Sequence, residues 1–321
     1  MDPTAITISE MDGQGGRKLI DPGHLKTLPG ERTYWIHIEQ NNDETKDWLI
    51  SLTGIDPEIV DALLADETRP RFFTKGQGLL VVLRGVNLNP GAELDDMISV
   101  RVWITPHQII TVNLRRMMAI RDIEVKLDEQ QGPSRSGEFL TELADRISDR
   151  ISPVLEALND SVDELEERVI GSGAHPQPFE ISELRLRIIR LKRHLFPQKE
   201  MMTHLIGIKS EWFRSQDRQK FREITDCIIR FAEDLESCRE RCIIARDELE
   251  SQHSQKTNKI LYLLSMITVI FLPLGLVTGL LGINVGGIPG ANNPLAFLGV
   301  CLILIIIVIL QICILKLKHW L

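Results

Sequence analysis

Charged side chains are missing from two long stretches near the C-terminus of this 321-residue chain. Between residues 260 and 283 the only ionisable side chain is Tyr262, and between residues 295 and 315 the only ones are Cys301 and Cys313. Each stretch exceeds about 18 residues, which is enough to cross a hydrocarbon core roughly 30 Å thick. The sequence therefore predicts two transmembrane helices.

Other absences exclude several classes of protein. The five cysteines form no CxxC pair and no Cys/His spacing of a zinc finger, which argues against a disulfide framework or a structural zinc module. Acidic residues outnumber basic ones by 45 to 37, and the resulting net charge of −8 gives no indication of nucleic-acid binding. The chain has no P-loop, no nucleophile elbow, no His-rich hydrolase motif and no GxGxxG after a strand, so we do not expect an enzyme.

Lysines flank the two apolar stretches, whereas the segment between them, residues 284–294, has no Lys or Arg. Lys256 and Lys259 precede the first stretch, and Lys316 and Lys318 follow the second. Because cytoplasmic loops carry the excess of basic residues, we expect a multi-pass protein of the inner (plasma) membrane with both termini in the cytoplasm. The N-terminus has neither the basic nor the apolar region of a signal peptide, which agrees with this topology.

The first 130 residues predict a mixed α/β domain. Its strand segments are rich in β-branched residues and separated by Gly, Pro and Asn. A helix is expected to open at Asp56, with Pro57 in its first position. A hairpin is expected to turn at residues 105–107. The strand segments are Thr33 to Glu39, Leu79 to Leu88 and Met97 to Asn113.

The chain from about residue 131 has the pattern of long helices. Two of them are expected on either side of a loop that starts at Gly171, and a third after a turn near residues 215–217. Neither Gly nor Pro occurs between Gly207 and Pro273, so this third helix is expected to run unbroken from a stalk into the first span. Its apolar residues alternate at intervals of three and four, a heptad seam that indicates either oligomers or tight packing within the chain. The seam consists of Phe221, Ile224, Ile228, Phe231, Leu235, Cys238, Cys242, Ala245 and Leu249.

One face of the first span carries small and polar residues at helical spacing. Small residues permit close packing of helices in a membrane, and they can equally line a narrow pore. Two helices from one chain cannot enclose a water-filled path, so a pore would need several copies. The stripe consists of Asn258, Leu261, Ser265, Thr268, Leu272, Gly275, Gly279 and Gly282.

A single amide, Asn284, follows the first span. In several copies around an axis it would give a ring of amide oxygens that contact the hydration shell of a hard cation. The alternative is a helix C-cap, where Gly and Asn are common. Within the span, Pro273 lacks an N–H, so the helix there should bend or leave a carbonyl without its usual partner.

The segment "GINVGGIP", residues 282–289, follows a Pro-containing span and precedes one further span and a basic tail. This arrangement resembles the CorA superfamily of divalent-cation transporters, with Gly-Ile-Asn in place of that superfamily's Gly-Met-Asn. The Ile, the following "GGIP" and the "TRPR" of residues 68–71 resemble its ZntB-like zinc-transporter branch. The resemblance covers essentially the whole chain.

The resemblance implies a CorA-like homopentamer with a cytoplasmic funnel, a pore lined by the first span and a selectivity filter of Gly282, Ile283 and Asn284. The expected pore lining is Gly279, Gly275, Leu272, Thr268, Leu264, Leu261 and Asn258. The expected organisation is an α/β domain (1–130), a helical domain (131–216), a stalk (217–259), the first span (260–283), an outer loop (284–294), the second span (295–315) and a cytoplasmic tail (316–321).

The transported cation is expected to be zinc, with magnesium, cobalt or nickel as the alternative, and no permanently bound cofactor is expected. Leu272 and Gly275 stand where magnesium members often have Met and Thr, which argues against a magnesium-type gate. The resemblance implies proton-coupled uptake, although neither span offers a carboxylate or His to relay a proton. A membrane-anchored sensor or scaffold is the alternative from another class.

Three cytoplasmic residues are further metal candidates. Asp247 falls near a regulatory acidic site of the magnesium members. Cys238 and Cys242 lie four residues apart on the stalk, so both can face one way as zinc ligands. A Cys pair on a heptad seam is more often small core filler. In the pore itself, Asn284 suits a hydrated ion.

Overall fold

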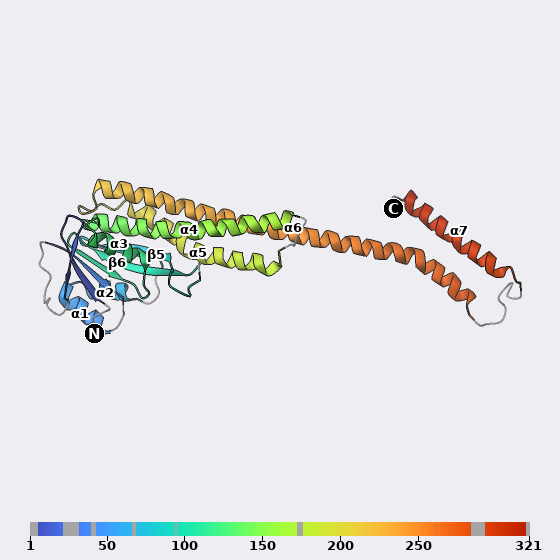
Figure 1. The fold of residues 1–321 in the computed structure, drawn as a ribbon, viewed down its shortest axis with the longest axis horizontal. Helices are drawn as coiled ribbons and strands as arrows, with labels where there is room; N and C mark the ends of the chain where they lie inside the picture. Colours follow the sequence, from blue (N-terminus) through green and yellow to red (C-terminus); the bar gives the residue numbers. More distant parts are fainter. Residues whose placement is uncertain are drawn as a thin grey trace. The chain divides into compact units, whose positions relative to one another are not determined.

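The computed structural model describes residues 6–21, 32–39, 43–65, 69–93, 95–171, 176–283 and 293–318 (Figure 1). The chain divides into two compact units, Met1–Arg246 and Asp247–Leu321. The division falls inside one helix, α6 (Ser215–Leu281), which contributes to both units. Each unit is described by itself.

The first unit contains a seven-stranded sheet with the order β2-β1-β3-β7-β6-β5-β4. Neighbouring strands are antiparallel except β3 and β7, which run parallel with Ile36 opposite Ile110. The predicted hairpin is confirmed, because β6 ends at Ile104 and β7 begins at Gln108. The strands are β1 (Ile6–Met11), β2 (Arg17–Ile20), β3 (Thr33–Ile38), β4 (Arg71–Lys75), β5 (Gly78–Val86), β6 (Met97–Ile104) and β7 (Gln108–Val112).

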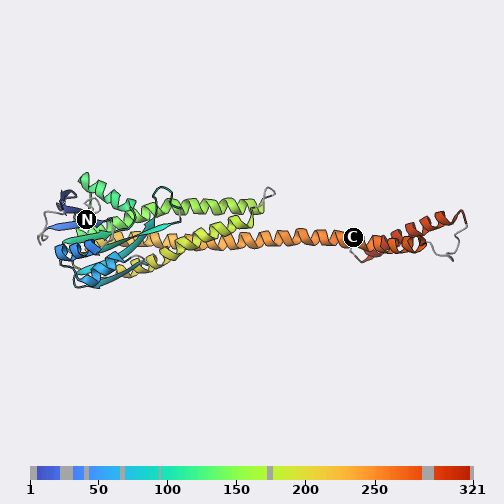
Figure 2. The ribbon, with the colours of Figure 1, turned by 90° about the horizontal axis from the view of Figure 1, so that it is seen from below.

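Helices cover both faces of this sheet (Figures 1 and 2). On one face, α1 (Asp43–Thr53) and α2 (Pro57–Leu64) share a buried core with strand residues such as Ile36 and Val82. As predicted, Asp56 caps α2: its side chain accepts from the backbone N–H of Glu58 at 3.0 Å, and Pro57 occupies the first turn. The sheet is therefore buried on this side by an amphipathic helix pair.

On the other face lies α4 (Ser136–Ile170), with α3 (Met118–Asp128) beside it. Phe139 meets the edge of Trp35 with ring centroids 4.9 Å apart, and Ile147 packs over Gly85 of β5. Since Gly85 has no side chain, the helix can approach the strand closely at that point. Gly171 ends α4, in agreement with the predicted loop there.

α4, α5 (Pro178–Leu205) and the first part of α6 lie side by side in the first unit (Figures 1 and 2). Charged pairs link them: Arg168 of α4 binds Glu180 of α5 at 2.7 Å, and Lys220 of α6 reaches Glu142 of α4 at 3.4 Å. The partly buried Glu142 also binds Lys126 at 2.5 Å. Desolvation raises the pKa of Glu142, but three nearby cations lower it. Lys126, Lys220 and Arg146 together hold the pKa of this carboxyl below its usual value of 4.5.

The heptad seam of α6 is buried inside a single chain. From Phe221 to Ala245 every seam residue is less than a tenth exposed, and only Leu249 at the end is partly exposed. Cys238 donates its thiol hydrogen to Asn159 of α4 at 2.9 Å across this seam. Of the two alternatives that the seam indicated, the structure therefore shows packing within the chain, and the seam by itself gives no argument for oligomers.

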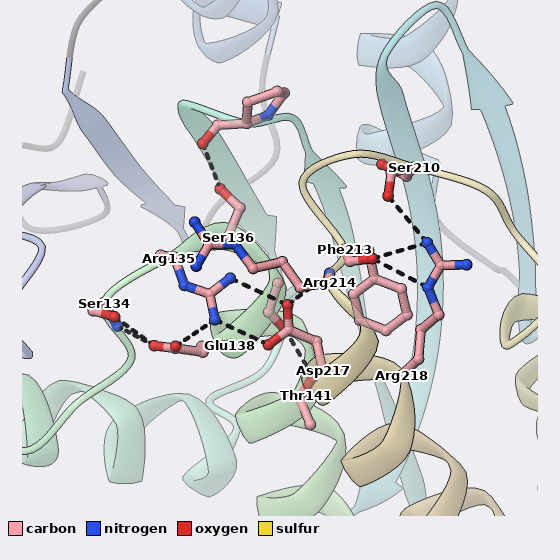
Figure 3. Close-up of polar contacts among 12 residues, drawn as sticks. Ser134, Arg135, Ser136, Glu138, Thr141, Ser210, Phe213, Arg214, Asp217 and Arg218 are labelled. Atoms are coloured by element: carbon pink, nitrogen blue, oxygen red, sulfur yellow. Dashed lines mark hydrogen bonds and ion pairs between the residues drawn. The ribbon is translucent and has the colours of Figure 1, made fainter.

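The start of α6 is fixed to the start of α4 through Asp217 (Figure 3). The carboxylate of Asp217 is buried, accepts the backbone N–H of Arg214 at 2.9 Å, and receives two hydrogen bonds of 3.2 Å from the guanidinium of Arg135. Arg135 in turn binds Glu138 at 2.5 Å. The contact to Arg214 satisfies an N–H that a helix N-terminus leaves without a partner.

Gly137 permits this junction, and alanine there is expected to destabilise the first unit by about 1–3 kcal/mol. A Cβ at Gly137 would lie 2.4 Å from Oδ2 of Asp217 and 2.9 Å from the carbonyl oxygen of Trp212, so either the ion pair or the backbone must move. Thermal unfolding of the whole chain in detergent measures the effect. Gly207→Ala is the matched control, since its nearest atom would be 3.4 Å away. Equal melting temperatures for the two variants would contradict the steric argument.

Candidate pore-lining helix

The second unit contains the apolar part of α6 and helix α7 (Ala296–Leu317). In the described part of the chain, these are the two helices whose length and composition allow them to cross a membrane. Both of the spans that the sequence predicts are thus helical. The predicted unbroken run from the stalk into the first span is confirmed, and α6 continues through Pro273 to Leu281.

One stripe of α6 is partly shielded from solvent and recurs every three or four residues. It consists of Met266, Ile270, Pro273, Leu274 and Val277. α7 carries a matching stripe, which ends in buried Leu315 and includes the partly buried Gln311. These are the faces through which the two spans pack, because this spacing places every member on one side of a helix.

The predicted pore-lining residues lie on the other side of α6. A helix turns by about 100° per residue, which places their stripe roughly opposite the stripe that packs on α7. All of them are exposed in the single chain: Asn258, Leu261, Leu264, Thr268, Leu272, Gly275 and Gly279. The face with small residues is therefore open to contact with something other than its own second span.

The groups that this open face exposes are neutral hydroxyl and carbonyl oxygen atoms and the backbone of glycines. Thr268 donates its hydroxyl hydrogen to the carbonyl of Leu264 at 2.8 Å, so its oxygen keeps lone pairs that can accept from water. A Cβ added at Gly275 or Gly279 would find no atom within 4 Å. Such a surface can contact the hydration shell of a cation, but it offers no thiolate or imidazole to bind a bare zinc ion.

A polar contact between the two spans was not predicted. Pro273 has no N–H, so the carbonyl of Val269, four residues before it, lacks its usual helical donor. The side-chain amide of Gln311 on α7 donates to that carbonyl at 3.1 Å. Gln311 is the single amide within residues 295–315, a signal that the sequence carried. Its partner could not be identified without the fold, because the two residues are 42 positions apart.

Replacing Gln311 by leucine is expected to destabilise the hairpin of spans by about 1–3 kcal/mol, because the Val269 carbonyl would then be unsatisfied in an apolar environment. The effect should shrink sharply in a Pro273→Ala background, where residue 273 regains the N–H that pairs with Val269. Melting temperatures of the four proteins in detergent give the coupling. An equal loss from Gln311→Leu in both backgrounds would mean that Gln311 acts through packing rather than through this carbonyl.

The predicted filter lies only partly within the described residues. The N–H of Gly282 closes the last turn of α6 on the carbonyls of Thr278 at 2.9 Å and Gly279 at 3.2 Å. Ile283 is about half exposed. Asn284, whose role as filter or cap the sequence left open, lies outside the described residues, as do residues 285–292.

The metal candidates that precede the first span are not brought together into a metal site. Cys238 and Cys242 are both buried, and desolvation raises the pKa of both thiols, that of Cys242 to about 11. The thiolate form that binds metal is therefore disfavoured. Asp247 is exposed. Among the residues that the structure describes, no group of three or more His, Cys, Asp or Glu side chains could hold a metal ion.

An α/β domain, joined by an unbroken helix to two apolar C-terminal helices long enough to span a bilayer, is the arrangement of an integral membrane protein. Residues 30–317 match the family described as CorA-like Mg2+ transporter protein. The chain is 36% identical over 298 residues to the divalent cation transporter CmaX of Pseudomonas aeruginosa, a match that covers 92% of this chain and 90% of that protein.

Two further comparisons agree. The chain is 32% identical over 304 residues to the zinc transport protein ZntB of Pectobacterium carotovorum, covering 95% of this chain and 92% of that protein. The solved structure of full-length CmaX superposes with a TM-score of 0.86 at 34% identity, covering 100% of this chain and 99% of that one. The chain belongs to the CorA-like family, and it is a transporter of divalent cations rather than an enzyme.

Proposed function

We propose that this protein is a homopentamer that takes up zinc through a central pore in the inner membrane. The pore is lined by the open face of α6, with the rings of Thr268, Gly275 and Gly279 facing the axis and Asn284 as the filter at the outer mouth. Both termini lie in the cytoplasm, and residues 284–294 form the outer loop. A cation passes with part of its hydration shell, because the lining consists of neutral oxygens and glycine backbone.

The observation that carries this proposal is the position of the small-residue stripe on the side of α6 opposite the stripe that packs on α7. A hairpin that served only as an anchor would place its small residues between its own two helices, where they permit close packing. Here that interface is made of larger apolar residues, and the glycines are left open. An oligomer that surrounds an axis is the arrangement that makes use of such a face.

Zinc as the cargo is supported by the zinc transport protein ZntB among the similar proteins. Leu272 and Gly275, at positions where magnesium members often have Met and Thr, also favour it. Magnesium, cobalt or nickel is the runner-up, since CmaX is described only as a divalent cation transporter and the family description names Mg2+. If uptake is coupled to protons, the protons would have to pass through the cytoplasmic unit or through the water in the pore. Neither apolar stretch contains a carboxylate or His that could relay them.

The test is metal flux into liposomes that contain the purified chain, with zinc and magnesium compared at equal concentration and with or without an inward proton gradient. Zinc influx that exceeds magnesium influx and rises with the gradient is expected. Magnesium influx that is indifferent to pH would reject zinc and proton coupling while leaving a channel of the wider family. No influx of any divalent cation would reject the pore.

A further inference from the structure

A cavity of about 540 Å³ lies in the first unit, away from the spans. Its walls come from the sheet, from the residues that follow β7 and from α5. A volume of this size falls within the range of small-molecule sites. Its polar lining consists of Arg69, Arg84, Ser99, Arg115, Arg193 and His194, together with Asp96.

The strand register places two of the polar lining residues beside each other. Arg84 of β5 lies opposite Ser99 of β6, and Arg71 of β4 lies opposite Val82 of β5. Arg69, two positions before the first residue of β4, lines the same cavity. The sheet thus presents a guanidinium and a hydroxyl group side by side, and the segment before β4 adds a second guanidinium to the cavity.

The opposite wall is fixed by a side chain of α5. β4 begins at Arg71, so the backbone of Arg84 extends beyond the edge strand that pairs with β5. Gln198 takes the place of the missing strand: its amide oxygen accepts the N–H of Arg84 at 2.7 Å, and its amide nitrogen donates to the carbonyl of Arg84 at 3.1 Å. Because Gln198 is buried, this double contact fixes α5 to β5 at Arg84, and Arg193 and His194, one turn earlier on α5, line the same cavity.

The charges of the cavity are unbalanced, although the chain as a whole is acidic. Among the described residues that line it, four arginines face one acidic residue, and that residue, Asp96, already binds Arg115 at 3.0 Å. Arg84 donates to the carbonyl of Met97 at 3.0 Å. Among the residues that the structure describes, Arg69 and Arg193 form no ion pair. Like charges gathered in a concave site repel one another and attract anions.

We propose that this cavity binds a small phosphorylated anion. A phosphate group has three charged oxygens and can accept hydrogen bonds from several guanidinium groups at once. A carboxylate has two oxygens, and one guanidinium group binds both of them in a bidentate pair. Arg69, Arg84 and Arg193 bind the phosphate oxygens, and Ser99 donates its hydroxyl. Arg69 belongs to the "TRPR" segment, for which the pore offers no role. The site lies entirely in the first unit and does not depend on the identity of the transported metal.

The probe is pyrophosphate, titrated calorimetrically into the full-length protein in detergent without divalent metals, which pyrophosphate would chelate. Saturable binding that weakens with added salt is expected.

The double variant Arg69→Gln/Arg193→Gln should bind pyrophosphate about tenfold more weakly or worse, since it loses charge-assisted hydrogen bonds. The affinity of Arg69→Lys/Arg193→Lys should lie between those of the wild type and the glutamine variant, because lysine keeps the positive charge but cannot form bidentate hydrogen bonds. Arg187→Gln, on α5 outside the cavity, is the matched control and should bind as the wild type does.

Melting temperatures without pyrophosphate establish that each variant is folded. Both arginines to be replaced are exposed, so folding should be unaffected. Absence of pyrophosphate binding in the wild type would overturn the proposal. So would equal affinity of wild type and Arg69→Gln/Arg193→Gln, or sulfate binding as tight as pyrophosphate at equal ionic strength, since these results would indicate a diffuse basic surface.

Discussion

Leucine at Gly279 is expected to abolish metal influx while leaving the hairpin of spans folded. A Cβ at Gly279 would meet no atom within 4 Å in the single chain, so the larger side chain disturbs neither α6 nor its contact with α7. In a pentamer, five leucines would instead project toward one axis and fill a pore that has room for a hydrated ion. The measurement is zinc influx into liposomes, with the melting temperature of the same preparation as the test of folding.

Gly299 of α7 offers a matched control for this substitution. It is also exposed, and an added Cβ there would also meet no atom within 4 Å. Gly299→Leu should keep wild-type influx, because in the proposed pore α7 lies behind α6. If Gly279→Leu transported as well as Gly299→Leu, the small-residue face would not line a pore, and the membrane-anchored sensor or scaffold would become the better hypothesis.

Alanine at Asn284 is expected to reduce zinc influx to the level of protein-free liposomes without unfolding the protein. The amide oxygen is the group that would contact the hydration shell of the entering cation, and alanine offers neither oxygen nor charge in its place. Influx and melting temperature are again measured together. Asn292→Ala, which removes another amide from the same outer segment, is the control and should transport normally.

An Asn284→Ala variant that retained influx would remove the filter assignment. A variant that lost both influx and thermal stability would favour the alternative role as a helix C-cap, whose loss costs helix stability rather than ion recognition. The two roles are therefore separated by the pair of measurements.

Local signals explain what the sequence predicted well. The cap at Asp56 with Pro57 defines the start of α2, the turn at residues 105–107 separates β6 from β7, and Gly171 ends α4. α6 was predicted as one continuous helix because no Gly or Pro interrupts it before Pro273. Each of these features depends on side chains within a few positions of one another.

The features that the sequence left open depend on distant partners. The parallel pairing of Ile36 with Ile110 and the contact of Gln311 with Val269 each join segments that are far apart in the chain. The heptad seam showed that α6 needed a partner, but not that α4 of the same chain supplies it. The short strands β1, β2 and β4 were also not identified, because only their pairing in the sheet distinguishes them from loops. For the proposed pore face, the sequence showed the stripe of small residues, and only the position of α7 showed which side of α6 remains open.

The central claim requires several copies around one axis, since two spans cannot enclose a water-filled path. The most direct measurement is therefore the native mass of the purified protein in detergent, corrected for bound detergent. The account predicts about 180 kDa, five times the 36.5 kDa of one chain. A single mass of 36.5 kDa under conditions that preserve transport would contradict the pore, because the open face of α6 would then have no second copy to face.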